Sequence, residues 1–185
     1  KAQIEQLLHQ TNLYDVRKKD VSSYSGGMRQ RFGIAQALLG SPRLIIVDEP
    51  TAGLDPQERN RFHNLLCEIS ENVIVILSTH IVEDVSQLCP NMAILIDGTV
   101  CLQGKPSNLI QEIDGSIWSK MLPRNQTAQY KEKFNVISER LVTGQTQIVI
   151  QSEFQPEIGF ELVSASLEDV YFSTLKKFEK GAQHA

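Results

Sequence analysis

Two short continuous apolar segments, 44–47 and 73–77, stand out along the chain, and each is closed by polar residues. Runs of this length are typical of strands that are buried on both faces of a parallel sheet. Between them, Phe62, Leu65 and Ile69 recur at helical spacing. This alternation of strand and helix predicts a parallel sheet. The expected strands are 43–47, 73–78, 92–97 and, after a turn at Asp97-Gly98, a short partner strand at 99–103.

Another helical pattern, within the first 40 residues, has an unusual beginning. Ser25 is a good N-cap residue, but Gly26 and Gly27 follow it, and each glycine costs a helix about 1 kcal/mol relative to alanine. Arg29 and Arg31 add positive charge at the end where the helix dipole is already positive. Glycines, accessible N–H groups and arginines are explained together if an anion binds at this helix tip. Phosphate is the anion we expect.

Acidic residues and a histidine directly follow the two apolar strands. Asp48 and Glu49 end the first strand, and Ser78-Thr79-His80 ends the second. Open α/β sheets place their ligand chemistry at the carboxyl ends of their strands. These side chains are therefore candidates for one shared site.

Two further helices have recognisable start signals. Asp55 is an N-cap candidate with Pro56 at the first helical position, and Glu58 completes a capping box. Ser166 and Asp169 form the same kind of box. Both helices are therefore expected to begin at these points.

The composition changes beyond Pro106. Residues 122–127 resemble a linker, because proline, asparagine and other polar residues cluster there. The segments 135–142 and 146–152 predict a β-hairpin that turns at 143–144. A small α/β appendage is therefore expected in the C-terminal part.

In this order, the segments resemble the C-terminal part of an ABC transporter ATPase. The matching motifs are the signature loop Tyr24-Ser25-Gly26-Gly27-Met28, the Walker B strand 44–49, the D-loop 52–55 and the H-loop His80. Tyr24 stands where leucine is usual and Met28 where glutamine is usual; both resemble the exporter-type branch, which energises drug, antibiotic or polysaccharide efflux. The resemblance covers residues 1 to about 105 and depends on the order of the motifs, because each alone is weak.

The resemblance implies a fold and a division of the chain. The fold would be α/β: a P-loop NTPase-like parallel sheet with helices, incomplete because the P-loop strand is missing. The expected parts are a partial helical signature subdomain at 1–40, the C-terminal part of the ATPase core at 41–120 and a small α/β appendage at 121–180.

It also implies a mechanism in which ATP lies between two such domains arranged head to tail. The catalytic residues would be Glu49, which orients or deprotonates the attacking water, and His80, which contacts the γ-phosphate. Asp48 would hold Mg²⁺, through water, because this ion keeps several of its waters. The nucleotide-binding residues implied by the resemblance are Ser25, Gly26, Gly27, Met28 and Asp55, the last facing the other domain.

One expected motif is absent from the sequence. A P-loop reads G-x-x-x-x-G-K-[ST], and no such string occurs in the 185 residues. We therefore expect the chain to be the C-terminal part of a longer protein, and to bind or hydrolyse ATP poorly by itself. In the sheet that the resemblance implies, the P-loop strand lies beside the strand that ends at His80. Its absence should leave that strand with an open apolar edge, which favours aggregation.

Charge and cysteine content narrow the functional class. The net charge of −4 argues against a nucleic-acid surface, which is normally basic. Three cysteines without a C-x-x-C pair suggest neither a disulfide framework nor a zinc site, and buried thiols are expected. His9, His63 and His184 lack a motif context and are predicted to be solvated.

The apolar runs are far shorter than the ~20 residues that cross a bilayer. Membrane association would come through a transmembrane permease subunit, which places the protein in the cytoplasm, peripheral on the inner face of the cell membrane. Two alternatives stay open: an ABC-like ATPase that acts on DNA, and a non-catalytic accessory piece. The first predicts long heptads and a basic face, which are not seen, and upstream sequence would decide the second.

Overall fold

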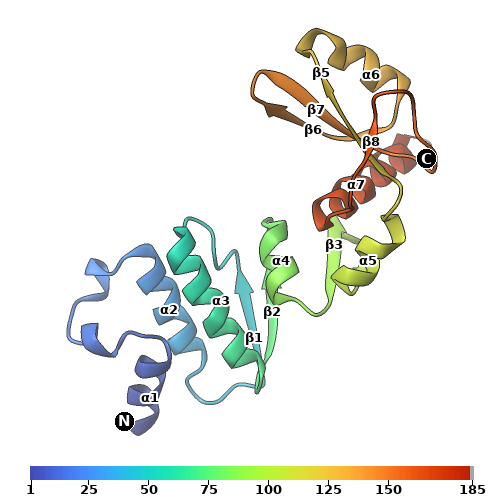
Figure 1. Cartoon of the computed structure of the whole chain (residues 1–185). Coiled ribbons are helices and arrows are strands. Elements are labelled where there is room, and N and C mark those ends of the chain that lie inside the picture. The colour runs from blue at the N-terminus through green and yellow to red at the C-terminus, as the bar shows by residue number, and fades with distance from the viewer. Residues whose placement is uncertain (184–185) are drawn as a thin grey trace. The chain divides into compact units, whose positions relative to one another are not determined.

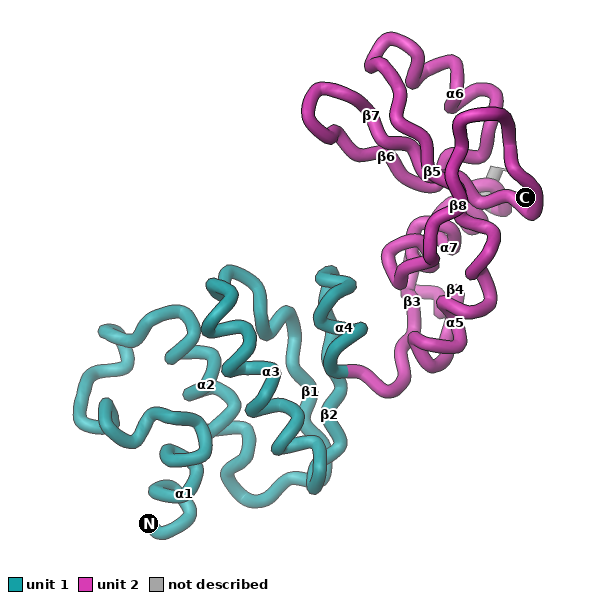
Figure 2. Tube along the Cα trace, in the orientation of Figure 1, with its two compact units in different colours: residues 1–88 teal, residues 89–185 magenta. Residues whose placement is uncertain are grey.

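The computed structural model describes residues 1–183, and the chain divides into two units, Lys1–Leu88 and Cys89–Ala185 (Figure 2). Each unit has its own core and its own sheets. The three-part division into 1–40, 41–120 and 121–180 stays a prediction.

The first unit places helices against a two-stranded parallel sheet (Figure 1). Leu44 pairs with Ile74 at one end of this sheet and Asp48 with Ser78 at the other, which confirms the two predicted strands. Helix α3 connects them and buries Phe62, which is 1% exposed. The elements are α1 (Ala2–Gln10), η1 (Tyr14–Val16), η2 (Val21–Ser23), α2 (Gly26–Ala37), β1 (Leu44–Asp48), α3 (Pro56–Ser70), β2 (Ile74–Ser78) and α4 (Val82–Leu88).

Among the described residues, one face of the β1–β2 sheet is covered and the other is exposed. Ile45 is buried in the core with α2 and α3, whereas Ile46 is 69% exposed and Ile74 is 66% exposed. The prediction of burial on both faces is therefore wrong for this structure, in which side chains alternate between core and solvent. The exposed isoleucines form an apolar surface of the kind that promotes aggregation.

The second unit begins with a hairpin and continues into a small mixed domain. Its elements are β3 (Met92–Ile96), β4 (Thr99–Gly104), α5 (Pro106–Ile113), β5 (Ile117–Leu122), η3 (Arg124–Gln126), α6 (Thr127–Lys133), β6 (Val136–Val142), β7 (Gln145–Gln151), β8 (Glu161–Leu162) and α7 (Leu167–Gln183). The larger sheet has the strand order β6-β7-β5-β8, with antiparallel pairs. The predicted hairpin at 135–142 and 146–152 is confirmed within one residue.

One predicted strand pairing is wrong. Strand 92–97 is predicted to join the parallel sheet, but among the described residues that sheet consists of β1 and β2. The predicted pairing of β3 with the strand after the turn, β4, is confirmed, in antiparallel register. Asp97 and Gly98 both have positive φ, at 48° and 75°, as a tight type I′ turn requires. This turn closes the local hairpin of β3 with β4.

The predicted linker at 122–127 is also wrong. Leu122 ends β5 and is 2% exposed, in a core cluster with Ile148 and Phe160. After Pro123, the chain turns through η3 directly into α6. The polar residues of this segment therefore form a turn within the second unit.

Glu157 is the centre of a charged cluster in the second unit. Its carboxylate accepts hydrogen bonds from Lys120 Nζ at 2.7 Å, from Lys133 Nζ at 2.7 Å and from the hydroxyl of Tyr130. These donors, Lys120 first, lower the pKa of Glu157 from 4.5 to about 2. The cluster joins β5 and α6 to the segment before β8.

Acidification should therefore destabilise the second unit. A carboxyl group whose pKa is lower in the folded state stabilises the fold at pH values above its unfolded-state pKa. This contribution is lost as the pH falls through the folded-state pKa and the group is protonated. The loss for Glu157 falls between pH 4.5 and about 2. Urea unfolding followed by the fluorescence of Trp118, the chain's single tryptophan, measures it.

The Glu157→Gln variant should show a weaker dependence of stability on pH in this range. Glu139→Gln is the matched control, because Glu139 pairs with Lys131 on an exposed surface. Equal pH dependence in wild type and Glu157→Gln would contradict the assignment.

Candidate functional site

The parallel arrangement of β1 and β2 brings their carboxyl ends together. Asp48 lies opposite Ser78 in the register, and the Ser78 hydroxyl donates a hydrogen bond to Asp48 Oδ1. The backbone N–H of Glu49 donates to the Ser78 carbonyl at 2.8 Å. The two acids and the end of β2 therefore share one edge of the sheet.

Glu49 and His80 are in direct contact. The backbone N–H of His80 donates to Glu49 Oε1 at 3.0 Å, and His80 Nδ1 lies 2.7 Å from Glu49 Oε2. The His80 side chain is 75% exposed, whereas that of Glu49 is 37% exposed. A carboxylate and an imidazole in contact, with the imidazole facing solvent, are groups of the kind that transfer protons to or from a bound molecule.

The backbone at Glu49 is unusual. Its φ is +45°, in the left-handed region that residues with a side chain seldom adopt. Such conformations cost about 1–3 kcal/mol and cluster at functional sites. The positive φ of Glu49 ends β1 and turns the backbone into the loop that leads to α3.

Asp48 fits a magnesium ion that is shared with a phosphate ligand. Among the described residues, no group of three His, Cys, Asp or Glu side chains could hold a metal. Mg²⁺ does not need one, because it binds through one or two carboxylates plus substrate phosphates and retains waters. Asp48 is exposed, and its Oδ1 is already oriented by Ser78.

The tip of α2 forms a second group of candidate residues. Ser25 is the N-cap as predicted, and its hydroxyl accepts a hydrogen bond from the Met28 N–H at 3.2 Å. Gly26 is exposed, with open space around the position of an added Cβ. The tip therefore offers a hydroxyl and accessible backbone to a ligand.

Gly27 and Arg31 have a structural explanation that differs from the anion hypothesis. A Cβ on Gly27 would lie 2.4 Å from Glu58 Oε2. Arg31 is buried, and its guanidinium forms an ion pair with the same carboxylate of α3. The interpretation that Arg31 awaits an anion is therefore wrong, because Glu58 already neutralises it; Arg29 remains exposed.

Replacing Gly27 by alanine should destabilise the first unit. The added methyl group would displace Glu58, and overpacking of this kind costs about 1–3 kcal/mol. Gly26→Ala is the matched control, since nothing lies within 4 Å of its added Cβ and alanine favours the helix. Urea unfolding followed by circular dichroism compares the two, and an equal effect would contradict the packing argument.

Asp55 caps α3 as predicted, but its capping box does not close. Its Oδ1 accepts from the Glu58 N–H at 2.8 Å. The Glu58 side chain turns instead to Arg31 and Arg61, because two guanidinium groups attract a carboxylate more strongly than one backbone N–H. Asp55 is exposed beside this ion-pair cluster.

The predicted residues thus form two groups in the first unit. Asp48, Glu49 and His80 meet at the strand ends, whereas Ser25, Gly26, Gly27 and Met28 lie at the tip of α2. Among residues 1–183, no hydrogen bond or ion pair joins these groups. Of these two groups, the one at the strand ends contains the carboxylates and the imidazole.

The prediction for His63 is wrong. His63 is 6% exposed, and its ring contacts Asp84 at 2.9 Å. Its position next to Phe62, on a helix with a strong apolar pattern, was the available signal. His9 is exposed as expected and stacks on Tyr14, and His184 lies outside the described residues.

The prediction of buried thiols is wrong for two cysteines. Cys67 is exposed and Cys101 is half-buried.

Comparisons with known proteins relate this chain to ABC transporters. The family model for ABC transporters matches residues 1–52. An uncharacterised ABC transporter ATP-binding protein of Bacillus subtilis, YxlF, is 28% identical over 93% of this chain. ABC transporter A family member 12 of Arabidopsis thaliana is 36% identical over 61% of it. The chain spans 63% of the length of the first relative and 12% of the second.

The solved structures similar to this chain are also proteins of ABC transporters. CbiO1 of Clostridium perfringens, part of the ABC transporter complex CbiONQ, matches with a TM-score of 0.56 and 32% identity. The match covers 60% of this chain and 45% of CbiO1. The ATP-binding cassette MJ1267 in its ADP conformation has the same TM-score at 20% identity, which shows the fold alone.

No helix in the described part of the chain is long and apolar enough to cross a bilayer. The α/β architecture is that of ABC ATPase domains. In its N-terminal region, this chain is a homologue of the ATP-binding proteins of ABC transporters.

Proposed function

We propose that this chain is part of an ATP-hydrolysing subunit that drives export through an ABC transporter. The observation that carries the proposal is the contact between Glu49 and His80 beside Asp48, at the carboxyl ends of two parallel strands. Homology to ABC transporter ATP-binding proteins supports the substrate, ATP. The export direction rests on Tyr24 and Met28 in the signature loop.

In the proposed mechanism, Glu49 orients the attacking water and accepts its proton. A positioned general base contributes about 10²–10⁴ in rate. His80, held by Glu49 at Nδ1, lies in solvent where the γ-phosphate would approach. Asp48 would hold Mg²⁺, which supplies positive charge to the phosphate oxygens when it is bound.

The tip of α2 would act on a nucleotide held by a second ATP-binding domain. Ser25 would donate its hydroxyl, and the exposed backbone at Gly26 allows close approach to phosphate. Met28 and Asp55 complete the proposed nucleotide-binding set, with Asp55 facing the partner domain. In the described residues no hydrogen bond or ion pair joins this tip to Glu49, which suits a tip that acts on the partner's nucleotide.

The remaining partners and the cellular location follow from the same proposal. A permease subunit would anchor the dimer at the inner face of the cell membrane, in the cytoplasm, and nucleic acid is not a partner. The signature subdomain would be 1–40, the core 41–120 and the appendage 121–180. Because residues 1–185 contain no P-loop string, we propose that they bind ATP poorly without the rest of the subunit.

Measurement of ATP turnover by the full-length protein tests the proposal. With its permease in lipid vesicles, the protein should release phosphate only when both ATP and Mg²⁺ are present. The permease should change this rate, since transport and hydrolysis are coupled. Absence of turnover under these conditions would overturn the proposal and favour a non-catalytic role.

A further inference from the structure

A buried carboxylate, that of Asp84, lies four residues after His80 in α4. Asp84 is 0% exposed, and it is the only Asp or Glu side chain with buried status in the described part of the chain. Burying a charge is costly unless donors compensate it. Its partners therefore indicate what it holds in place.

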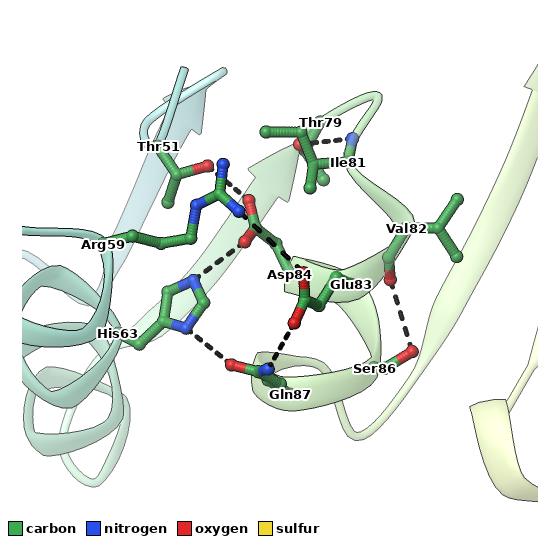
Figure 3. Close-up of polar contacts among 10 residues, drawn as sticks. All are labelled: Thr51, Arg59, His63, Thr79, Ile81, Val82, Glu83, Asp84, Ser86 and Gln87. Atoms are coloured by element: carbon green, nitrogen blue, oxygen red, sulfur yellow. Dashed lines mark hydrogen bonds and ion pairs between the residues drawn. The ribbon is translucent and has the colours of Figure 1, made fainter. Parts of the chain in front are cut away.

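The first partner is Thr51, two residues after Glu49. Thr51 is 0% exposed, and its hydroxyl donates to Asp84 Oδ2 (Figure 3). The N–H of Ala52 donates to the Glu49 carbonyl at 3.2 Å, which closes a tight turn around Thr51. A shift of Thr51 would therefore move Glu49.

The second partner is His63 of α3. Its Nε2 lies 2.9 Å from Asp84 Oδ1, and its Nδ1 lies 2.9 Å from Gln87 Oε1 (Figure 3). The Gln87 amide nitrogen donates to Glu83 at 3.3 Å, so the oxygen of this amide faces the ring. Both imidazole nitrogens therefore have polar partners, Nε2 on Asp84 and Nδ1 on Gln87.

Asp84 itself belongs to the His80 side of the site. It lies in the first turn of α4, and its N–H donates to the Ile81 carbonyl at 3.1 Å. Ile81 directly follows His80 and donates its own N–H to Thr79 at 3.0 Å. One side chain thereby ties the turn after Glu49 to the turn after His80.

Building on the proposed ATPase, we infer that Asp84 is a positioning residue: through Thr51 it sets the contact between Glu49 and His80, and His63 fixes its orientation. Asp84 does not touch the nucleotide in this role. Both of its oxygens are used, one by the loop and one by α3, so the carboxylate cannot turn without losing a buried hydrogen bond. Glu49 and His80 are then held at their spacing before substrate arrives.

The test compares Thr51→Val with Thr51→Ser in the full-length protein. Valine has the shape of threonine but no hydroxyl, whereas serine keeps the donor. Because small misplacement of catalytic groups costs up to about 100-fold in rate, Thr51→Val should lower kcat by about 10- to 100-fold with KM for ATP unchanged. Thr51→Ser should restore most of the rate. Wild-type kcat in Thr51→Val, or an equal loss in both variants, overturns the inference.

A second measurement does not depend on ATP hydrolysis. In ¹⁵N-histidine-labelled full-length protein without nucleotide, the ring signals of His80 should shift in Thr51→Val and match the wild type in Thr51→Ser. Unchanged His80 signals in Thr51→Val overturn the inference. If the wild-type protein had no turnover, the proposed function would fail, and these spectra would still decide the role of Asp84.

A matched control and a second route guard against simple unfolding. Thr127→Val removes a buried hydroxyl that has no partner among the described residues, and should leave kcat and the His80 signals unchanged. Where Thr51→Val does not fold, His63→Gln and His63→Leu replace it, because glutamine keeps an N–H for Asp84 and leucine does not. Higher kcat in His63→Gln supports the inference; equal kcat overturns it.

Discussion

Glutamine in place of Glu49 should lower the ATPase rate of the full-length protein by about 10²–10⁴-fold, the usual contribution of a positioned general base. The amide keeps the acceptor for the His80 N–H, which Glu49 Oε1 provides at 3.0 Å. It cannot accept a proton from water. The variant should therefore bind ATP as tightly as the wild type, and the loss should appear in kcat.

Phosphate release and equilibrium binding of a fluorescent ATP analogue measure the two quantities separately. Glu68→Gln is the control, since Glu68 is an exposed acid of α3 in the same unit. Equal turnover by wild type and Glu49→Gln would remove Glu49 from the mechanism. Loss of binding together with turnover would assign Glu49 to nucleotide affinity instead.

Most elements of the fold were predictable because their signals are local. Apolar runs predicted β1 and β2, and the turn residues 143–144 predicted the β6–β7 hairpin. Asp55 and Ser166 cap α3 and α7 where their sequence motifs indicated. In each case the residues that determine the structure lie within a few positions of one another.

Pairings between distant strands were less predictable. The pairing of β3 with β4 is predictable from the turn at Asp97-Gly98, whose positive φ angles suit a tight hairpin. The apolar pattern of β3 does not show whether its other edge joins the parallel sheet. Residues 122–127 were misinterpreted for a related reason, because a polar turn inside a domain and a linker have the same composition.

The sequence predicts which residues lie in the candidate site, but it does not predict the contacts that support them. Parallel strands place Asp48, Glu49 and His80 at one edge, which follows from topology. The contact of His63 with Asp84, 21 positions away, depends on how α3 and α4 pack. No local pattern carries the information about this contact, although the apolar pattern around Phe62 favours burial of His63.

The ion pair beneath the α2 tip was missed in the same way, and its loss should have the largest effect on stability. Glu58→Gln would leave the buried Arg31 guanidinium without its carboxylate. Breaking a buried pair in this way costs about 3–5 kcal/mol. Urea unfolding and hydrogen exchange of α2 and α3 measure the change.

Arg61→Gln is the matched control for Glu58→Gln, because Arg61 contacts the same carboxylate at 2.8 Å but is 51% exposed. Exposed pairs contribute about 0–1 kcal/mol, so this variant should unfold close to the wild-type urea midpoint. If both variants lose the same stability, the pair with Arg31 does not hold α2 against α3. If only Glu58→Gln is destabilised, the ion pair between Arg31 and Glu58 holds the tip of α2 in place. The close approach of Gly27 to Glu58 then belongs to the same packing.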